Sequence, residues 1–426
     1  MKRSFFWALL LAAGSALGSG RASAQRADTL SSRQVGPGVT YRRMVRLDGP
    51  WIVNVIAVDL RRGDLTLRHV RAHDQLRTRE RPTEMVARHE RAGEVVLAAV
   101  NGDFFDLKTG ENENNQVVDG EWWKGVKVTD SPFDTFANPH AQFGLDSANH
   151  PLIDQFRFDG EARTAKVAFT LIALNAVPTG IEGTALFTPR FGAKVPVEIA
   201  RPVRDLGKDP DNAPSTAPKA PVRAVAEAPL VRAGSRGGAQ LYVRRGPVCN
   251  LSGGYIPVDG AVLVGYGGTA KDVAGVGEGE TLAVTLRTVP ASPRAPLAQL
   301  IGGWPRILRD GRNIAANSAA EEGTIARNAM ARHPRTVVGF SRDSATLYLV
   351  TVDGRSQKSV GMTTVELADL MLELGAWQAM NFDGGGSTTM VVQDTIVNSP
   401  TDPTGEREVG NALLLVRRAV PAGKPR

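Results

Sequence analysis

The chain has 426 residues and a formal net charge of +7, from 51 lysines and arginines against 44 aspartates and glutamates. Hydrophobic residues at 42% and charged residues at 22% are ordinary globular values, so the composition excludes a chain that is disordered throughout. With 45 glycines and 26 prolines, it favours short strands and turns over a helical bundle. The length allows two or three domains, or one large β-rich domain.

The first 24 residues have the three parts of a secretory signal. Lys2 and Arg3 are basic, residues 5–13 are apolar, and small residues lead to Ala24. We expect cleavage after Ala24 and a secreted or periplasmic protein. The apolar run is too short for a membrane span, and no later segment has the roughly 18 uninterrupted apolar residues that a span needs.

Charge and cysteine content narrow the possible partners. Loss of the signal's three basic residues lowers the net charge from +7 to +4, and no basic stripe is visible, so we expect no nucleic-acid partner. A single cysteine, Cys249, excludes an internal disulfide. We interpret Cys249 as an apolar filler of a strand rather than a catalytic thiol, because no histidine or asparagine signature surrounds it.

The first predicted elements follow the signal. Residues 25–38 are polar and glycine-bearing, which indicates a flexible N-terminal segment. Alternating apolar residues from 39 to 70 predict two strands joined as a hairpin by the turn at 61–64. Residues 83–94 have helical spacing, and the apolar run at 95–100 is typical of a buried strand.

From about residue 143 to 289, strand signals alternate with turns. Five prolines, interspersed with alanine and charged residues, fall between residues 206 and 239. Because such a stretch packs poorly, we expect an exposed, Pro/Ala-rich insertion at residues 207–238.

The last third is the most regular part of the chain. Thr363 and Glu366 form a capping box before a helix that Gly375 closes. Strands are predicted over residues 346–352, 377–382, 388–393 and 411–416, with a tight loop at 383–387 and a basic, disordered tail at 417–426. Together the elements predict an α+β fold, with mixed, strand-rich sheets and flanking helices in one large catalytic domain over residues 39–416.

Polar and acidic residues collect where the predicted strands end. Asp103, Asp353 and Asp383 each follow a strand, and these strand ends would meet at one rim if the strands shared a sheet and a direction. The three glycines at 384–386 let the backbone approach a ligand and offer successive N–H groups to an anion. A tight turn without function is an equally common reading of such a loop.

An arginine, the histidines and a serine are further candidates for phosphate binding, metal binding and nucleophilic catalysis. Arg335, just before an apolar strand, suits bidentate phosphate binding, with a surface arginine as the alternative. The six histidines show no metal-type spacing, so a zinc site is not predicted. Ser387 lacks the GxSxG context of a serine hydrolase.

A series of motifs resembles one known family. The motifs, in chain order, are Asn-Gly-Asp-Phe-Phe at 101–105, His-Ala-Gln-Phe-Gly at 140–144, Ile-Gly-Gly-Trp-Pro at 301–305 with Arg-Asp-Gly at 309–311, Pro-Arg-Thr at 334–336, Asp-Gly-Arg at 353–355, Asn-Phe-Asp-Gly-Gly-Gly-Ser at 381–387 and Glu-Arg-Glu-Val-Gly-Asn-Ala at 406–412. They are similar to the phosphodiester glycosidase family, which includes the lysosomal N-acetylglucosamine-1-phosphodiester α-N-acetylglucosaminidase and bacterial relatives.

The resemblance implies an enzyme that hydrolyses a sugar-1-phosphodiester to free sugar and a phosphomonoester. The implied catalytic residues are Asp383, Asp353 and Arg335. The implied substrate-binding residues are Asn101, Phe105, Thr336, Gly354, Arg355, Asn381, Gly384, Gly385, Gly386, Ser387, Arg407 and Asn411. Asp103 departs from the family, which commonly has a glycine or another small residue there, so we do not assign it a catalytic role.

We hypothesise that Arg335 and the glycine loop hold phosphate, with Asp383 or Asp353 as general base or nucleophile. Carboxylates about 5 Å apart would predict retention at the anomeric carbon, and about 6.5–9.5 Å would predict inversion. The expected partner is a phosphate-linked glycan, no cofactor is predicted, and the need for a divalent cation stays open. The alternatives are a non-catalytic glycan-binding protein of the cell envelope and a metal-dependent phosphodiesterase.

Overall fold

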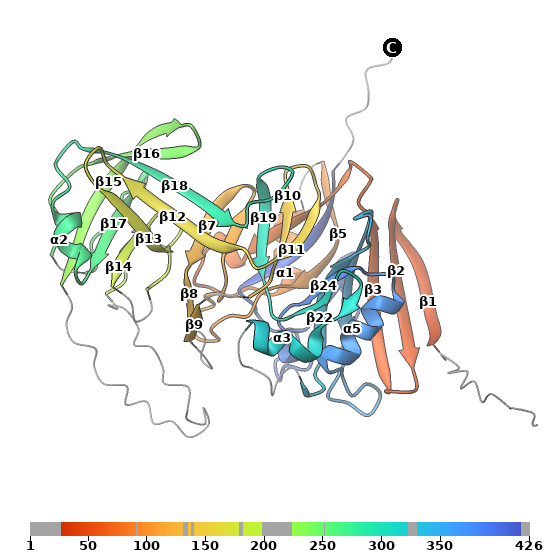
Figure 1. Cartoon of the computed structure of the whole chain (residues 1–426). Coiled ribbons are helices and arrows are strands. Elements are labelled where there is room, and N and C mark those ends of the chain that lie inside the picture. The colour runs from red at the N-terminus through yellow and green to blue at the C-terminus, as the bar shows by residue number, and fades with distance from the viewer. Residues whose placement is uncertain are drawn as a thin grey trace, which may run out of the picture.

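Two stacked sheets and a strand barrel make up the computed structural model of the chain (Figure 1). The structure describes residues 27–418, except residues 91–92, 131–134, 138–139, 179–181, 198–223, 251 and 323–329. The predicted signal, residues 1–24, therefore lies outside the described residues. Within the described part of the chain, no helix is long and apolar enough to span a membrane.

The larger stacked sheet has eight strands, and all its pairings are antiparallel. In spatial order they are β1 (Ala27–Gly36), β2 (Val39–Arg46), β3 (Trp51–Asp59), β23 (Thr346–Val352), β22 (Arg335–Phe340), β24 (Gln378–Asn381), β20 (Arg306–Arg309) and β21 (Arg312–Asn313). The second sheet has five strands, in the order β26 (Thr395–Ile396), β25 (Met390–Val392), β5 (Glu94–Asn101), β27 (Asn411–Arg418) and β4 (Leu65–Arg71).

Both stacked sheets are buried on their two faces. In β27, Leu413 and Leu415 join the core between the sheets, whereas Leu414 and Val416 face the helix α1 (Pro82–His89). This follows from the two-residue period of a strand, which sends successive side chains to opposite faces. On the outer face of the eight-stranded sheet, the same role falls to α3 (Ala315–Glu322) and α5 (Thr364–Glu373). The layers are therefore helix, sheet, sheet, helix.

Residues 157–289 build a seven-stranded barrel, seen beside the stacked sheets in Figure 1. Its strands are β12 (Arg157–Arg163), β13 (Ala168–Leu174), β14 (Gly183–Phe187), β15 (Val225–Arg236), β16 (Ala239–Arg244), β17 (Gly260–Tyr266) and β18 (Thr281–Val289). The ring closes because β13 pairs with both β12 and β14. The short helix α2 (Thr269–Ala274) packs on β17 and β15.

The remaining strands connect the barrel to the stacked sheets. They are β6 (Gln116–Val118), β7 (Glu121–Val126), β8 (Val128–Asp130), β9 (Thr135–Ala137), β10 (Gln142–Asp146), β11 (Pro151–Asp154) and β19 (Leu297–Gly302). The barrel is thus inserted between β11 and β19, and β7 joins it by pairing with β13. Two single turns of 3-10 helix, η1 (Ala72–Asp74) and η2 (Gly385–Ser387), complete the fold.

The predicted strand-rich sheets with flanking helices are found, although strand outweighs helix more than an α+β label implies. The capping box is confirmed: Thr363 Oγ1 accepts from the N–H of Glu366, and α5 follows. The hairpin predicted across residues 61–64 is wrong, since β3 and β4 belong to different sheets. Each of these strands needs apolar partners on both faces, and the turn passes from one sheet to the other.

Two segments expected to lack structure are strands. Residues 27–36 form β1, an edge strand whose backbone pairs with β2. Residues 225–236 form β15, so only residues 207–223 of the predicted insertion lie outside the described residues. Pro229 lies where the regular pairing with β16 has not yet begun, and its carbonyl accepts the Arg245 N–H at 3.0 Å.

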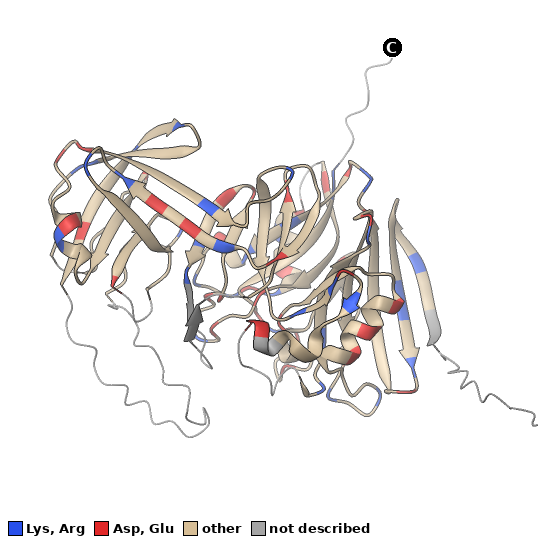
Figure 2. Cartoon of the chain, in the orientation of Figure 1, with Lys and Arg blue, Asp and Glu red and all other residues tan. Residues whose placement is uncertain are grey.

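Two smaller expectations also change. Cys249 is exposed and its backbone bridges to Glu227, so the interpretation as an apolar filler is wrong. The C-terminal strand β27 continues to Arg418, and the rest of the predicted tail, residues 419–426, lies outside the described residues. Acidic and basic residues occur on the barrel as well as on the stacked sheets and α5 (Figure 2).

The inner core predicts a test of the layered arrangement. Leu413→Ala removes a fully buried side chain between the sheets, so we expect the free energy of unfolding to fall by about 2–5 kcal/mol. Urea unfolding followed by fluorescence measures this change. The matched control is Leu47→Ala, whose side chain is 66% exposed and should change stability by less than about 0.5 kcal/mol. Equal effects of the two substitutions would contradict the core described here.

Candidate active site at the edge of the stacked sheets

Strand pairing brings three of the predicted loops to one edge of the eight-stranded sheet. Arg335, the first residue of β22, pairs with Val352 at the end of β23. Val337 in the same strand pairs with Asn381 at the end of β24. Since β23 and β24 flank β22 and both run antiparallel to it, the loops that carry Asp353 and Asp383 leave the sheet at the same edge.

The second sheet contributes to this edge through Asn101. This residue ends β5, and its side chain is buried against residues of the other sheet. Its Oδ1 accepts the Thr336 hydroxyl at 2.7 Å, and its Nδ2 donates to the Asp383 carbonyl at 2.7 Å. The N–H of Asp383 in turn donates to the carbonyl of Gly102 at 2.9 Å. The predicted strand ends therefore meet, although they come from two sheets rather than one.

The glycine loop is built by close approaches that a side chain would block. A Cβ on Gly384 would lie 2.7 Å from the Pro334 carbonyl oxygen, and one on Gly386 would collide with the Arg407 guanidinium. Gly385 has φ +60°, which favours glycine, and a Cβ there would lie 2.9 Å from Nη2 of Arg355. Arg355 thus lies against Gly385, and Arg407 lies against Gly386.

Arg407 is fixed by hydrogen bonds, whereas Arg355 is exposed. Arg407 donates from Nε to Asp402 Oδ2 at 2.6 Å and from Nη1 to Ser387 Oγ at 3.2 Å. Arg355 makes one long contact, from Nη1 to Thr401 Oγ1 at 3.4 Å. Two guanidinium groups beside the glycine loop suit an oxyanion such as phosphate.

Asp383 sits beneath this loop with a perturbed acidity. Its Oδ1 accepts the N–H of Gly384 at 2.8 Å. Burial raises the pKa of Asp383 to about 6, against the lowering effects of the Ser387 hydrogen bond and the Arg407 charge. A carboxyl group with a pKa near neutral can both take and give a proton at physiological pH.

Asp353 is the second predicted carboxylate of this edge. It is buried, and burial is the main cause that raises its pKa, with hydrogen bonds from Ser399 opposing the shift. Oδ1 accepts the Ser399 N–H at 3.1 Å, but Oδ2 has no hydrogen-bond partner among the described residues. The buried Asn381 Oδ1 and the hydroxyls of Thr388 and Thr389 likewise have no hydrogen-bond partner among the described residues. Unpaired buried polar atoms on neighbouring loops are typical of a ligand site.

Arg335 has a different environment from the one predicted. It is 5% exposed, which rules out the alternative of a surface arginine. Nε donates to the Met362 carbonyl and Nη2 to the Ala331 carbonyl, both at 2.8 Å. Burial lowers its pKa to about 10, so it stays charged. These bonds attach the start of β22 to the segments around it, and Arg355 and Arg407 are the guanidinium groups at the glycine loop.

The other predicted residues divide into supports of the loops and one core residue. Asn411 Oδ1 accepts the N–H of Asp103 at 2.9 Å, and Asn381 Nδ2 donates to the Trp304 carbonyl at 2.7 Å. A Cβ on Gly354 would lie 2.7 Å from the Pro334 nitrogen, so this glycine permits close packing of two loops. Phe105 instead belongs to the apolar cluster beneath α1.

Asp103 is the residue that the sequence analysis set aside. It is buried, and its carboxylate accepts the Asn114 side chain at 2.7 Å and the Asn114 N–H at 3.0 Å. Burial raises its pKa to about 6, and the negative charge of nearby Asp383 adds to the shift. His140 contacts Asn114 from the other side, Nδ1 to Oδ1 at 3.1 Å. The asparagine-rich run at residues 112–115 was the sequence feature that could have indicated the partner of Asp103, but such runs are common in turns.

Comparisons with known proteins agree with the motifs. The model of the phosphodiester glycosidase family matches residues 231–416, so the predicted resemblance is confirmed over this part of the chain. The prophage-derived protein YomE of Bacillus subtilis is 38% identical over 84 residues, which cover 20% of this chain and 13% of YomE. The mouse N-acetylglucosamine-1-phosphodiester alpha-N-acetylglucosaminidase is 29% identical over 117 residues, which cover 26% of this chain and 22% of the enzyme.

Solved structures share the fold more widely than these sequences do. A hypothetical protein from Synechocystis superposes with a TM-score of 0.68 at 19% identity, covering 93% of this chain and 65% of that one. A protein from Burkholderia pseudomallei gives a TM-score of 0.63 at 25% identity, covering 86% of this chain and 74% of that one. The stacked sheets and the barrel therefore occur together in these two solved proteins as well.

The acidity of Asp383 predicts how stability depends on pH. Its folded-state pKa of about 6 lies above the ordinary value of 3.8, so the folded protein loses stability as pH rises through this interval. Asp383→Asn has no such penalty. We expect this variant to gain on the order of 2 kcal/mol over the wild type between pH 4 and pH 7, measured by urea unfolding at each pH.

Asp402→Asn is the matched control with the opposite sign. Although partial burial opposes it, hydrogen bonds from Thr404 and Arg407 lower the pKa of Asp402 to about 2. The charged form therefore stabilises the folded state above pH 4, and the stability is lost as pH falls towards 2. Asp402→Asn should be less stable than the wild type throughout the range where Asp383→Asn is more stable. Parallel pH profiles for the two variants would contradict both assignments.

Proposed function

We propose that this chain is an exported hydrolase of sugar-1-phosphodiesters, of the N-acetylglucosamine-1-phosphodiester type, which releases the sugar and leaves a phosphomonoester. The family match and the mammalian relatives named for this activity support the reaction class. The observation that carries the proposal is the half-buried carboxyl group of Asp383, which directly precedes a glycine loop that two arginines contact. Export rests on the signal pattern in residues 1–24.

The loop and its two arginines suit the leaving group. A phosphodiester carries one negative charge, and the phosphomonoester that leaves the anomeric carbon carries up to two. Donors that contact the phosphate therefore bind the transition state more tightly than the substrate, which is the requirement for catalysis. We assign Arg355 and Arg407 to this charge, since the N–H groups of Gly384, Gly385 and Ser387 already donate within the protein.

The carboxyl groups supply the proton chemistry. Asp383 and Asp103 both have pKa values of about 6 and influence each other, so one can be protonated while the other is ionised near that pH. In our scheme, Asp383 or Asp353 acts on the water or on the anomeric carbon, and Asp103 adjusts the acidity of Asp383. The water's hydroxyl group is added to the sugar, and its proton ends on the carboxylate or the solvent.

The first test is the turnover of a model α-GlcNAc-1-phosphodiester, followed by release of free sugar. Asp383→Asn keeps the acceptor for the Gly384 N–H but cannot take a proton, so we expect kcat to fall by at least ~100-fold. The matched control is Asp394→Asn, an exposed residue in the turn between β25 and β26, which should leave kcat unchanged.

The outcome separates the proposal from its alternatives. Binding of the phosphodiester without product at any pH would identify a glycan-binding protein and end the enzyme reading. Turnover that EDTA abolishes and one divalent cation restores would identify a metal-dependent phosphodiesterase instead. Among the described residues, no group of three His, Cys, Asp or Glu side chains is placed to hold a metal ion.

The two loop arginines predict a second, independent effect. Arg407→Ala and Arg355→Ala each remove a donor from the place where phosphate charge grows, so we expect kcat/KM to fall by roughly 10–100-fold. Initial rates with the same model phosphodiester measure this. Arg61→Ala is the control, because Arg61 is exposed at the opposite edge of the eight-stranded sheet. A loss in Arg61→Ala equal to the other two would show a general charge effect and contradict the phosphate assignment.

A further inference from the structure

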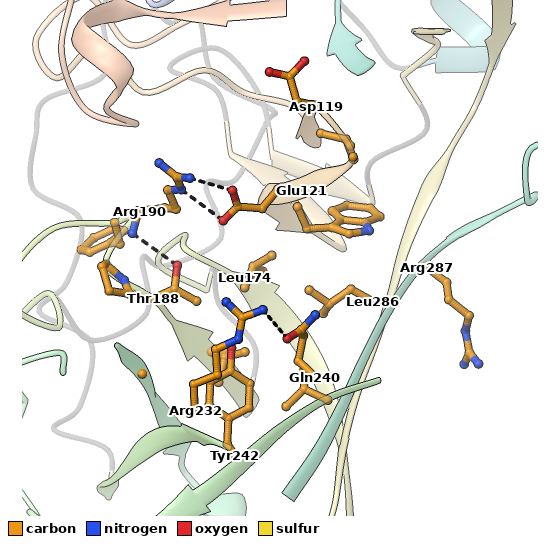
Figure 3. A pocket seen from close by; sticks show the side chains of 18 of the residues that line it. Asp119, Glu121, Leu174, Thr188, Arg190, Arg232, Gln240, Tyr242, Leu286 and Arg287 are labelled. Atoms are coloured by element: carbon orange, nitrogen blue, oxygen red, sulfur yellow. Dashed lines mark hydrogen bonds and ion pairs between the residues drawn. The ribbon is translucent and has the colours of Figure 1, made fainter. Parts of the chain in front are cut away.

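A large cavity lies at the mouth of the barrel, and none of its lining residues belongs to the glycine loop. It has a volume of about 2040 Å³ and is lined by the ends of barrel strands, the β6–β7 turn and loops around residues 188–193, 255–260 and 291–297 (Figure 3). This is about twice the upper limit of pockets that hold one drug-sized ligand, about 300–1,000 Å³. The cavity is therefore large enough for a chain of several sugar units.

The cavity combines an apolar floor with paired polar walls. Leu174 and Tyr242, both buried, and half-buried Leu286 contribute to its lining from the barrel strands. In Figure 3, two polar pairs lie on opposite sides of Leu174. One is the Glu121–Arg190 ion pair at 2.6 Å, and the other is Arg232, which donates to Gln240 Oε1 at 2.8 Å.

Aromatic side chains occur where a sugar ring could stack. Tyr255 lines the rim and is 73% exposed, with Lys194 Nζ 4.5 Å from its ring centroid. Trp122 lines the wall, half-buried, with its ring edge-on to Phe158. Aromatic rings bury the C–H face of a sugar, while planar amide, carboxylate and guanidinium groups bond its hydroxyls. Few other ligand classes need both kinds of surface side by side.

The charges of the lining argue against other polymers. Five arginines and four acidic residues line the cavity, so no strong excess of positive charge attracts a nucleic acid. A lipid would need apolar walls as well as an apolar floor. A neutral or lightly charged glycan suits this near-balance.

The cavity wall is connected to the candidate active site. Arg77, in the cavity lining, lies 3.7 Å from Glu111, and Glu111 accepts a bond from Lys124 at 2.9 Å. Lys124 also bonds the Asn112 carbonyl, and Asn112 donates to the Asp103 carbonyl at 3.0 Å. A polar network therefore leads from the cavity lining to Asp103, next to Gly102, whose carbonyl accepts the Asp383 N–H.

We propose that the barrel mouth is a binding cleft for an oligosaccharide chain, which it holds while the end of the chain is presented to the glycine loop. This inference rests on the proposed function for the identity of the chain. The barrel would then select polymers over single sugar phosphates through Tyr255 and the Arg232–Gln240 pair.

The test measures binding of a GlcNAc hexasaccharide that carries one 1-phosphodiester, here called the oligomer, and of a single-unit GlcNAc-1-phosphodiester by calorimetry. The full chain carrying Asp383→Asn is used, so that no turnover interferes. We expect the oligomer to bind at least ~10-fold more tightly than the single unit. Arg232→Ala with Gln240→Ala, and separately Tyr255→Ala, should each remove most of that difference.

The control is Arg236→Ala, an exposed residue of the same strand β15 outside the cavity, which should bind the oligomer as tightly as its parent. Chitohexaose forms a second arm: tight binding that depends on Tyr255 and Arg232 supports a cleft for glycans in general. Oligomer binding no tighter than the single unit, or unchanged by both cavity variants, would overturn the inference. Wild-type turnover of the single unit, measured alongside, shows whether the proposed function itself stands.

Discussion

The candidate site depends on the side chain of one buried asparagine, Asn101. Its Oδ1 accepts from the Thr336 hydroxyl and from the Thr389 N–H, and its Nδ2 donates to the Asp383 carbonyl. These bonds join the two stacked sheets at the edge where the glycine loop begins. Loss of one of these bonds would leave a buried polar group unsatisfied, at a cost of about 1–3 kcal/mol. We therefore expect the bonds of Asn101 to form together.

This hydrogen-bonded edge of the sheets holds two carboxyl groups in positions where burial disfavours their ionised forms. Asn411 holds the backbone of Asp103 and Asn101 holds the backbone of Asp383, and burial raises the pKa of both carboxyls to about 6. In a softer structure, the loops would move and let water reach the carboxylates. The stability of the sheets therefore offsets the cost of burying groups whose acidity suits proton transfer, a balance that is common at active sites.

Local signals in the sequence predicted the parts of the fold that depend on local physics. The capping box at Thr363, the strand over residues 346–352 and the glycine loop were all predicted because neighbouring residues determine them. The partners of β3 and β4 were not, since both strands have apolar residues on both faces and only the packed core decides which sheet each joins.

The candidate site, like the fold, was predicted from the sequence only in part. Motifs brought Asp383, Asp353 and the glycine loop together correctly as neighbours in space. They did not predict that Arg335 is buried and bonded to the Met362 carbonyl, because the direction of a long side chain depends on groups that are distant in the sequence. Asp103 was set aside for a similar reason: its acidity comes from burial and from Asp383, neither of which is visible in the residues beside it.

The barrel explains how one chain can keep this edge constant and still change what it binds. It is inserted between β11 and β19, and it closes its own hydrogen-bond ladders, so the ring contributes no strand to the edge that carries Asp383. Changes at its mouth therefore leave the pairing of β22 with β23 and β24 untouched. Because the polar network through Glu111 and Lys124 reaches Asp103, a ligand at the mouth can still affect the acidity of the carboxyl pair.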